Sequence, residues 1–486
     1  MPIFATYGKD GRRITQPNNI APNPKRIDID NPLEGKPEHS VLIIGAGTFG
    51  TSTAYHLAQL YKDPSKVTII DQSSGPPKLA AAIDVNRVIR TDYANKLYCD
   101  LACETIHPWF WSEELGPFFH KVGWLMYEEE GSNLKSRIKS TFEGRGSTQA
   151  QDIDLNNISS RWNALQGTSS EGFQSAYFNP EAGWCDAAQA THAFMQAAER
   201  KGIRRETGKV TQLLHDPSTN TVTGARTADG RTFSADKTIL CAGPWTSSLL
   251  STIEEPLSLP TNLRIESQIQ ATGLCAAYYN CTDTEISQLD NFQLPVVVYG
   301  GLGEIIPPSH GNKLMKYANS RSGIINPHTL PSGHKISIPA EDQYCVPECL
   351  KRETKAMISD KVLPAFAKGK EPDYWRICWD AQTPTEDFLI CKHPDQEKLK
   401  GLYVATGGSF HSYKFLPIIG KYILNVLYDV SNGEEKDQAW AWKDFEKGQW
   451  VDVHERGLLS HKSVVKTELA ALFARDGGSK VSGPRL

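Results

Sequence analysis

The chain repeats one hydrophobic pattern three times, in which a short apolar run leads into a glycine-rich turn. Residues 40–44 run into GAGTFG (45–50), after which apolar residues recur at helical spacing to residue 60. The β-branched run VTII then ends at Asp71. These segments predict a strand, a tight turn, a helix and a second strand, which is the order of a βαβ unit. Both strands are expected to be parallel and buried, because their residues are almost all apolar.

The other two copies of the pattern occur later in the chain. Residues 237–241 lead into Ala-Gly-Pro, and YVAT (403–406) leads into GGSFHSYKF and a helical pattern at 416–427. Between the copies, segments with clustered tryptophans and alternating runs, such as KVGWLMY (121–127), are typical of a second sheet. Since the two kinds of segment alternate along the chain, we predict two interleaved domains.

The sequence GAGTFG fits the dinucleotide-binding pattern GxGxxG. In this pattern Gly45 permits the tight turn, Gly47 lets a pyrophosphate approach the backbone, and Gly50 allows close helix packing. Asp71 is placed to accept a hydrogen bond from a ribose hydroxyl. The alternative is a purely structural glycine turn. The flanking strand and helix, together with the acid, favour a dinucleotide, and the position near the start of a long interleaved chain favours FAD over NAD.

Composition narrows the class of protein. The 486 residues, of which 39% are apolar, can bury more than one core. A formal charge of -4 offers no cationic face to a nucleic acid. The ten cysteines contain no CxxC pair, which predicts neither a disulfide scaffold nor a metal site. Without an apolar run of roughly 18 residues or a secretory signal, we expect no membrane contact and a reducing compartment.

Five side chains are candidates for the chemistry. Arg87 and Arg90 lie three apart in DVNRVIRTDY, which on a helical turn would put both on one face. A guanidinium suits a carboxylate because it donates two parallel hydrogen bonds. Cys378 ends an apolar stretch in RICWDAQTPTEDFLI, while His411 and Lys414 follow a glycine turn. Taken singly, these residues have ordinary alternatives: a surface salt bridge, a buried thiol, a core histidine and a solvated charge.

In order along the chain, the segments GAGTFG, DVNRVIR, GWLMY, AGWCDA, TILCAGPW, RICWDAQTPTEDFLI and GGSFHSYKFLPIIGK resemble the sarcosine oxidase and fructosyl amino acid oxidase (amadoriase) family of flavoenzymes. The resemblance covers residues 41–442. It implies an α/β fold in which a D-amino-acid-oxidase-like, FAD-binding Rossmann domain is interleaved with a mixed-sheet substrate domain. The expected parts are an N-terminal arm at 1–38, the FAD-binding domain at 39–90, 176–255 and 376–445, the substrate domain at 91–175 and 256–375, and a C-terminal tail at 446–486 that is frayed from residue 462.

The resemblance also implies roles for individual residues. Cys378 falls where the family joins its sulfur to the 8α carbon of FAD. Arg90 and Lys414 fall where the family clamps a substrate carboxylate, so they are the expected catalytic and substrate-binding residues, with His411 as a further substrate contact. No metal is expected. The expected cofactor contacts are Gly45, Gly47, Thr48, Phe49, Gly50, Asp71, Val210, Gly243, Cys378, Gly407 and Gly408.

The implied reaction oxidises the secondary amine of an N-substituted amino acid to an imine, which is hydrolysed or, in a biosynthetic pathway, cyclises. The alternatives are deglycation of fructosyl amino acids and a noncatalytic flavin-binding protein that acts by interaction. One position departs from the family, because Thr272 falls where the family has an oxygen-activating lysine. Either Arg87 or His411 then supplies the positive charge, or an acceptor other than O2 takes the electrons.

The remaining expectations concern assembly and location. We expect a monomer whose partners are an amino-acid-like substrate and O2 or another electron acceptor. The cytoplasm is the first expected location. The peroxisome is the second, because the C-terminal PRL loosely resembles a peroxisomal signal.

Overall fold

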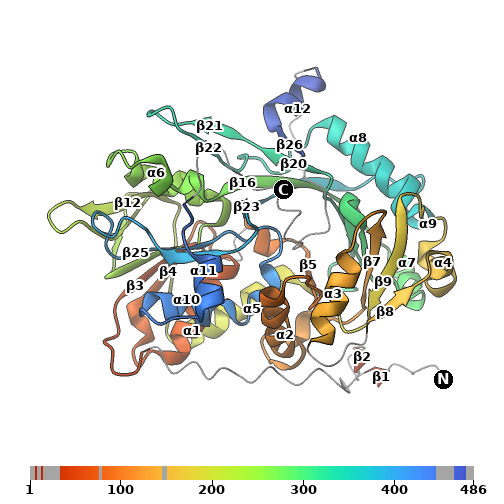
Figure 1. Ribbon diagram of the computed structural model, residues 1–486, viewed down its shortest axis with the longest axis horizontal. Coiled ribbons are helices and arrows are strands. Elements are labelled where there is room, and N and C mark those ends of the chain that lie inside the picture. The colour runs from red at the N-terminus through yellow and green to blue at the C-terminus, as the bar shows by residue number, and fades with distance from the viewer. Residues whose placement is uncertain are drawn as a thin grey trace.

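The computed structural model describes residues 6–7, 13–14, 33–75, 79–144, 150–444 and 465–477. Two large sheets lie next to each other, and most of the helices pack beneath and around them (Figure 1). Within the described part of the chain, no helix is long and apolar enough to cross a membrane. The helices are α1 (Thr48–Leu60), α2 (Lys96–Trp111), α3 (Leu134–Glu143), α4 (Ile158–Arg161), α5 (Ala187–Arg200), α6 (Thr246–Glu254), α7 (Asp283–Asn291), α8 (Glu348–Met357), α9 (Pro364–Ala367), α10 (Ile419–Leu427), α11 (Glu434–Trp440) and α12 (Leu469–Arg475).

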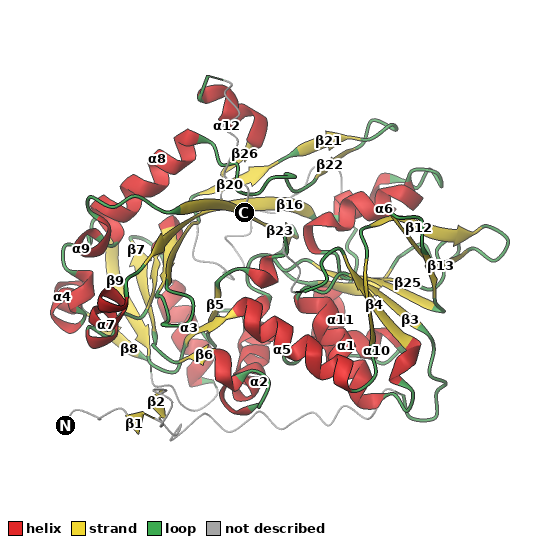
Figure 2. Ribbon diagram, turned by 180° about the vertical axis from the view of Figure 1, so that it is seen from behind, coloured by secondary structure: helices red, strands yellow, loops and turns green. Residues whose placement is uncertain are grey.

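In the part of the chain that the structure describes, four small sheets accompany the two large ones. One of them, with the order β5, β10, β6, lies in the centre of the molecule between the large sheets (Figure 2). The small sheets consist of β1 (Thr6–Tyr7) and β2 (Arg13–Ile14); β5 (Asn86–Ile89), β6 (Phe119–His120) and β10 (Gly183–Asp186); β12 (Val210–Asp216), β13 (Thr221–Thr227) and β14 (Thr232–Ser234); and β21 (Pro327–Thr329) and β22 (Lys335–Ser337).

The first large sheet is the nucleotide-binding sheet, with the order β11, β4, β3, β15, β25, β24. Its strands are β3 (Val41–Ile44), β4 (Val67–Asp71), β11 (Arg204–Thr207), β15 (Lys237–Leu240), β24 (Leu389–Lys392) and β25 (Leu402–Thr406). Neighbours are parallel except β24 and β25. On β3, Val41 and Ile43 pack against α1 and α10, whereas Leu42 and Ile44 pack toward β12, β13 and α6. Both faces are buried, which explains the continuous apolar run.

The second large sheet is mixed and has ten strands. They are β7 (Trp124–Glu129), β8 (Gln151–Ile153), β9 (Phe173–Asn179), β16 (Gln270–Asn280), β17 (Val296–Tyr299), β18 (Gly303–Ile306), β19 (Leu314–Asn319), β20 (Ser322–Ile325), β23 (Tyr374–Gln382) and β26 (Val465–Glu468). The long strands β16 and β23 are antiparallel and pair Thr272 with Asp380 and Leu274 with Cys378. Paired residues share a face of the sheet, so these four side chains lie on one side.

The fold confirms the predicted α/β class, and the predicted βαβ unit appears as β3, α1 and β4. Two local expectations are wrong. Arg87 belongs to the strand β5 and Arg90 directly follows its end at Ile89, so the two arginines do not share the face of a helical turn. The tail is not frayed throughout, because residues 465–475 form β26 and α12. The proposed domain boundaries stay predictions.

Candidate active site

In the turn after β3, glycine is required at two positions because neighbouring backbone atoms leave no room for a Cβ. Gly45 has a φ of +103°, and a Cβ there would lie 2.5 Å from the carbonyl oxygen of Cys241. A Cβ on Gly50 would lie 1.8 Å from the carbonyl oxygen of Gly45. A Cβ on Gly47 would meet no described atom within 4 Å, and Gly47 borders a large pocket. The turn is therefore closed toward the protein and open toward the pocket.

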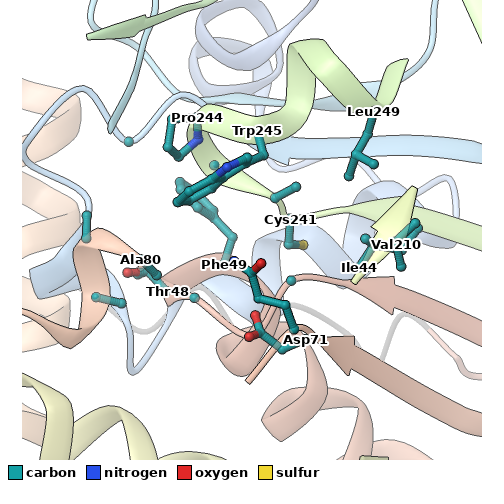
Figure 3. A pocket seen from close by; sticks show the side chains of 18 of the residues that line it. Ile44, Thr48, Phe49, Asp71, Ala80, Val210, Cys241, Pro244, Trp245 and Leu249 are labelled. Carbon is teal, nitrogen blue, oxygen red and sulfur yellow. The ribbon is translucent and has the colours of Figure 1, made fainter. Parts of the chain in front are cut away.

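This pocket, together with the open solvent at its mouth, contains about 1010 Å³ of empty space. Thr48, Phe49 and Asp71 line one side and Trp245 the other (Figure 3). Asp71 accepts hydrogen bonds from the backbone N–H groups of Ala46, at 3.0 Å, and Ser73, at 2.9 Å. Burial raises the pKa of Asp71. The pocket has the carboxylate and the open glycine backbone that a ribose and a pyrophosphate require, so these residues fit FAD.

The expected cofactor contacts are distributed unevenly around the pocket. Gly45, Gly47, Thr48, Phe49, Asp71, Val210, Gly243 and Gly408 line it, while Gly50 packs behind the turn. Gly407 has a φ of +77° and positions the loop at the far end, next to Gly408. Sequence reasoning missed Trp245 and Asp380, which also line the pocket. Trp245 directly follows the second glycine turn, Ala242 to Pro244, a signal that could have placed it.

Two alanine substitutions are predicted to separate folding from cofactor binding. Gly50→Ala should lower the free energy of unfolding of the apoprotein by about 1 to 3 kcal/mol, because its methyl group would overlap backbone atoms. Gly47→Ala should leave that stability almost unchanged and weaken FAD binding, because its methyl group would enter the pocket. Denaturant unfolding and FAD titration of the apoproteins measure both effects. Equal destabilisation by the two variants would contradict the prediction that Gly50 serves folding and Gly47 serves cofactor binding.

Cys378 lies two residues before Asp380 on β23, beside a cluster of charged side chains. The Arg87 guanidinium donates a hydrogen bond to the Cys378 Sγ at 3.1 Å. Arg87 also forms an ion pair of 2.5 Å with Asp84, and Lys316 forms one of 2.6 Å with the same carboxylate. Two cations thus share one carboxylate next to the thiol.

Arg90 and Lys414 meet at the ring of Tyr93. The Arg90 guanidinium lies 4.6 Å from the Tyr93 ring centroid and 4.9 Å from that of Trp124. The Lys414 Nζ donates a hydrogen bond of 2.9 Å to the Tyr93 hydroxyl. Burial, followed by the nearby charge of Arg90, holds the pKa of Lys414 well below its usual range. The Arg90 Nη1 is buried and has no hydrogen-bond partner among the described residues. The two cations therefore repel each other, and one has an unused donor.

His411 connects this pair of cations to the loop after β23. Its Nδ1 lies 3.2 Å from the Tyr93 hydroxyl, and its Nε2 lies 2.9 Å from the carbonyl oxygen of Glu386. Burial and the charge of Lys414 lower the pKa of His411 to about 3. The imidazole is therefore neutral near pH 7 and does not supply a positive charge. Tyr93, which sequence reasoning missed, contacts all three of the predicted substrate-side residues.

Thr272 is buried on β16, opposite Asp380. Its Oγ1 lies 3.4 Å from the carbonyl oxygen of Gln270. The Thr272 side chain therefore contributes no charge to the face of the sheet that carries Cys378.

Comparison with known proteins assigns the family. The model of the FAD dependent oxidoreductase family matches residues 40–425, and the chain belongs to this family. L-saccharopine oxidase of Schizosaccharomyces pombe is 27% identical over 87% of this chain and 98% of its own length. Monomeric sarcosine oxidase of Bacillus sp. is 23% identical over 78% of this chain and 90% of its own length. The fructosamine oxidase Amadoriase II of Aspergillus fumigatus superposes with a TM-score of 0.75 at 25% identity, covering 88% of this chain and 95% of its own.

These similarities confirm the predicted relationship to sarcosine oxidases and amadoriases. The protein is an FAD-dependent oxidoreductase with the fold of that family. The noncatalytic alternative has no support in them, since the relatives are named as enzymes.

Proposed function

We propose that this enzyme oxidises the C–N bond of a secondary amine in an N-substituted amino acid. The observation that carries the proposal is the pair of cations at Tyr93. Arg90 has a buried donor without a partner among the described residues, and burial, followed by the nearby charge of Arg90, lowers the pKa of Lys414. A substrate carboxylate between them would accept the unused hydrogen bond and relieve the repulsion. The names of the relatives, which include oxidases of sarcosine and L-saccharopine, support this class of substrate.

The residues of the chain orient the substrate. Arg90 and Lys414 hold the carboxylate, while Tyr93 and the neutral His411 fix the position of the Lys414 ammonium. Fixing the carboxylate also fixes the Cα–H and the amine nitrogen, and such orientation can lower a barrier by several kcal/mol. FAD, when bound, supplies the acceptor for the two electrons of the amine. Water then splits the imine, or an internal nucleophile captures it by cyclisation.

We further propose that FAD is joined to the Sγ of Cys378 and that O2 is the electron acceptor. The position of Cys378 supports the attachment, because its Sγ accepts a hydrogen bond from Arg87 and it lies two residues before Asp380, which lines the FAD pocket. Several relatives are named as oxidases, which supports O2. Assembly as a monomer and location in the cytoplasm remain expectations, and the PRL terminus lies outside the described residues.

Deglycation is the second candidate function, favoured by the close superposition with Amadoriase II, a deglycating enzyme. Both candidates share the carboxylate clamp and differ in the substituent on nitrogen. A substrate series therefore distinguishes them.

The test of the function is anaerobic bleaching of the flavin absorbance by paired compounds. N-methyl, N-carboxyalkyl and N-fructosyl derivatives of one amino acid should be compared with the N-acetyl derivative, which has no oxidisable amine nitrogen. We expect at least one secondary amine to bleach the flavin and the N-acetyl derivative to leave it unchanged. Bleaching by the N-fructosyl compound alone would select deglycation. Bleaching only by the unsubstituted primary amine would contradict the proposal.

A further inference from the structure

Transfer of electrons to O2 places negative charge on a neutral molecule, so a fixed cation beside the cofactor lowers the barrier. The two candidates from the sequence do not supply this charge freely. His411 is neutral near pH 7, and the guanidinium of Arg87 is paired with Asp84. Thr272 carries no charge. Arg87 and Lys316 share the carboxylate of Asp84 near Cys378, so a positive charge at the Thr272 end of this face has to come from another part of the chain.

The C-terminal strand β26 brings a lysine to this face. It runs parallel to β20 and pairs Lys466 with Gly323 and Thr467 with Ile324. On the other side of β20, Ile324 is paired with Gly273 of β16. Side chains alternate along each strand, so Lys466 lies on the opposite face from Thr467 and Gly273.

That opposite face is the one that carries Cys378 and Thr272. Leu274, the neighbour of Gly273, is paired with Cys378, and Thr272 is on the same side of β16. The Lys466 Nζ donates a hydrogen bond of 2.7 Å to the Oε1 of Gln270. Gln270 precedes Thr272 by two residues on the same face, a separation of about 7 Å along the strand. The ammonium thus lies on the Thr272 side of the sheet, although it belongs to a distant part of the sequence.

Lys466 remains a cation near neutral pH. Burial lowers its pKa to about 8, and the nearby Glu386 opposes this decrease. Burial also raises the pKa of Glu386 to about 8, and the Glu386 Oε2 has no hydrogen-bond partner among the described residues. The two groups are coupled, because a charged Glu386 favours the charged form of Lys466.

We propose that Lys466 supplies the fixed positive charge that assists reduction of O2 at this active site. O2 takes two electrons from the reduced cofactor and two protons, giving H2O2. Lys466 stabilises the negative charge that the first electron creates on O2. This inference rests on the part of the proposed function that makes O2 the acceptor. Lys466 also lies outside residues 40–425, the part of the chain that the family model matches.

Contacts of α12 hold β26 in place. The backbone N–H of Cys349 on α8 donates a hydrogen bond of 3.0 Å to the Asp476 carboxylate. Leu469 and Leu472 of α12 pack with Leu350 of α8. The contacts of this segment therefore fix the position of the strand that carries Lys466.

The test measures reoxidation without any substrate. The cofactor is reduced with dithionite under anaerobic conditions and mixed with O2 in a stopped-flow instrument. Lys466→Met, which keeps the length and loses the charge, should reoxidise at least about tenfold more slowly. Lys466→Arg should restore most of the rate. Lys335→Met, which removes an exposed lysine from the strand β22, should leave the rate of reoxidation unchanged.

A second measurement separates charge from structure. Sulfite is an anion that adds to oxidised flavins. It should bind Lys466→Met more weakly than the unmodified protein, and it should bind Lys466→Arg about as strongly as the unmodified protein. In the Lys466→Met background, Thr272→Lys should recover reoxidation, because it places a cation on the same face. Substrate bleaching of the flavin should change less than about twofold in Lys466→Met.

Two results would overturn the proposal. The first is unchanged reoxidation of Lys466→Met, and the second is an equal loss of substrate bleaching and reoxidation that neither Lys466→Arg nor Thr272→Lys reverses. If no secondary amine bleaches the flavin of the unmodified protein, the proposed function fails instead. The dithionite experiment still tests Lys466 in that case.

Discussion

Replacing Arg90 with alanine is expected to lower kcat/KM for carboxylate substrates by about 2 to 5 kcal/mol, which is a factor of roughly 30 to several thousand. The Arg90 Nη1 is buried without a partner among the described residues, and Lys414 lies across the same Tyr93 ring. Removing the guanidinium would leave a substrate carboxylate with one cation in a buried site. Steady-state kinetics with an N-substituted amino acid and with its amide measure the loss.

The amide is the internal control for this prediction. It lacks the anion, so Arg90→Ala should reduce its kcat/KM much less. Arg161→Ala provides a matched protein control, because Arg161 also stacks on aromatic rings, those of Trp162 and Phe178, but belongs to the helix α4. Arg161→Ala should leave kcat/KM unchanged for both compounds. Equal losses on acid and amide in Arg90→Ala would remove the carboxylate clamp from the mechanism.

Replacing Cys378 with alanine is expected to convert the cofactor from fully retained to fully released on denaturation. The Sγ of Cys378 lies 3.1 Å from the Arg87 guanidinium and two residues from Asp380 at the far end of the FAD pocket. Acid precipitation of the unmodified protein should leave the yellow chromophore in the pellet, and its mass should exceed that of the chain by one FAD. Precipitated Cys378→Ala should be colourless, with the FAD in the supernatant.

Cys275→Ala is the matched control for the attachment. Cys275 is also buried, on the adjacent strand β16, but it is paired with Ile377 and faces the other side of the sheet. The chromophore should remain in its pellet. Release of all the flavin from the unmodified protein would show that the cofactor is held without a covalent bond. Cys378→Ala should still fold and bind FAD, because the glycine turn and Asp71 are unchanged.

Much of the nucleotide-binding half could be predicted because its signals are local. The run into GAGTFG, the following helix and the acid at Asp71 lie within about thirty residues, and each is set by hydrophobic period or by backbone sterics. The clamp was harder to predict. Arg90 and Lys414 were named through a resemblance, whereas the residue that joins them, Tyr93, has no signal in its own segment.

Helical spacing misplaced the two arginines for a related reason. Residues three apart share one face of a helix but lie on opposite sides of a strand. The short segment 86–89 is a strand only because it pairs with β10, nearly a hundred residues later. Local propensity does not contain that partner, so the sequence could not decide which arginine reaches Cys378 and which reaches Tyr93.

The sequence by itself determined the βαβ unit, the glycine turn, the acid at its end and the class of cofactor, since these depend on contacts among near neighbours. The tertiary structure alone decided that His411 is neutral, that Arg90 keeps an unused donor, and that Lys466 faces the side of Cys378. Burial and ionisation depend on every surrounding atom. Strand register depends on pairing between distant segments. For that reason a lysine in an expected frayed tail becomes part of the active site.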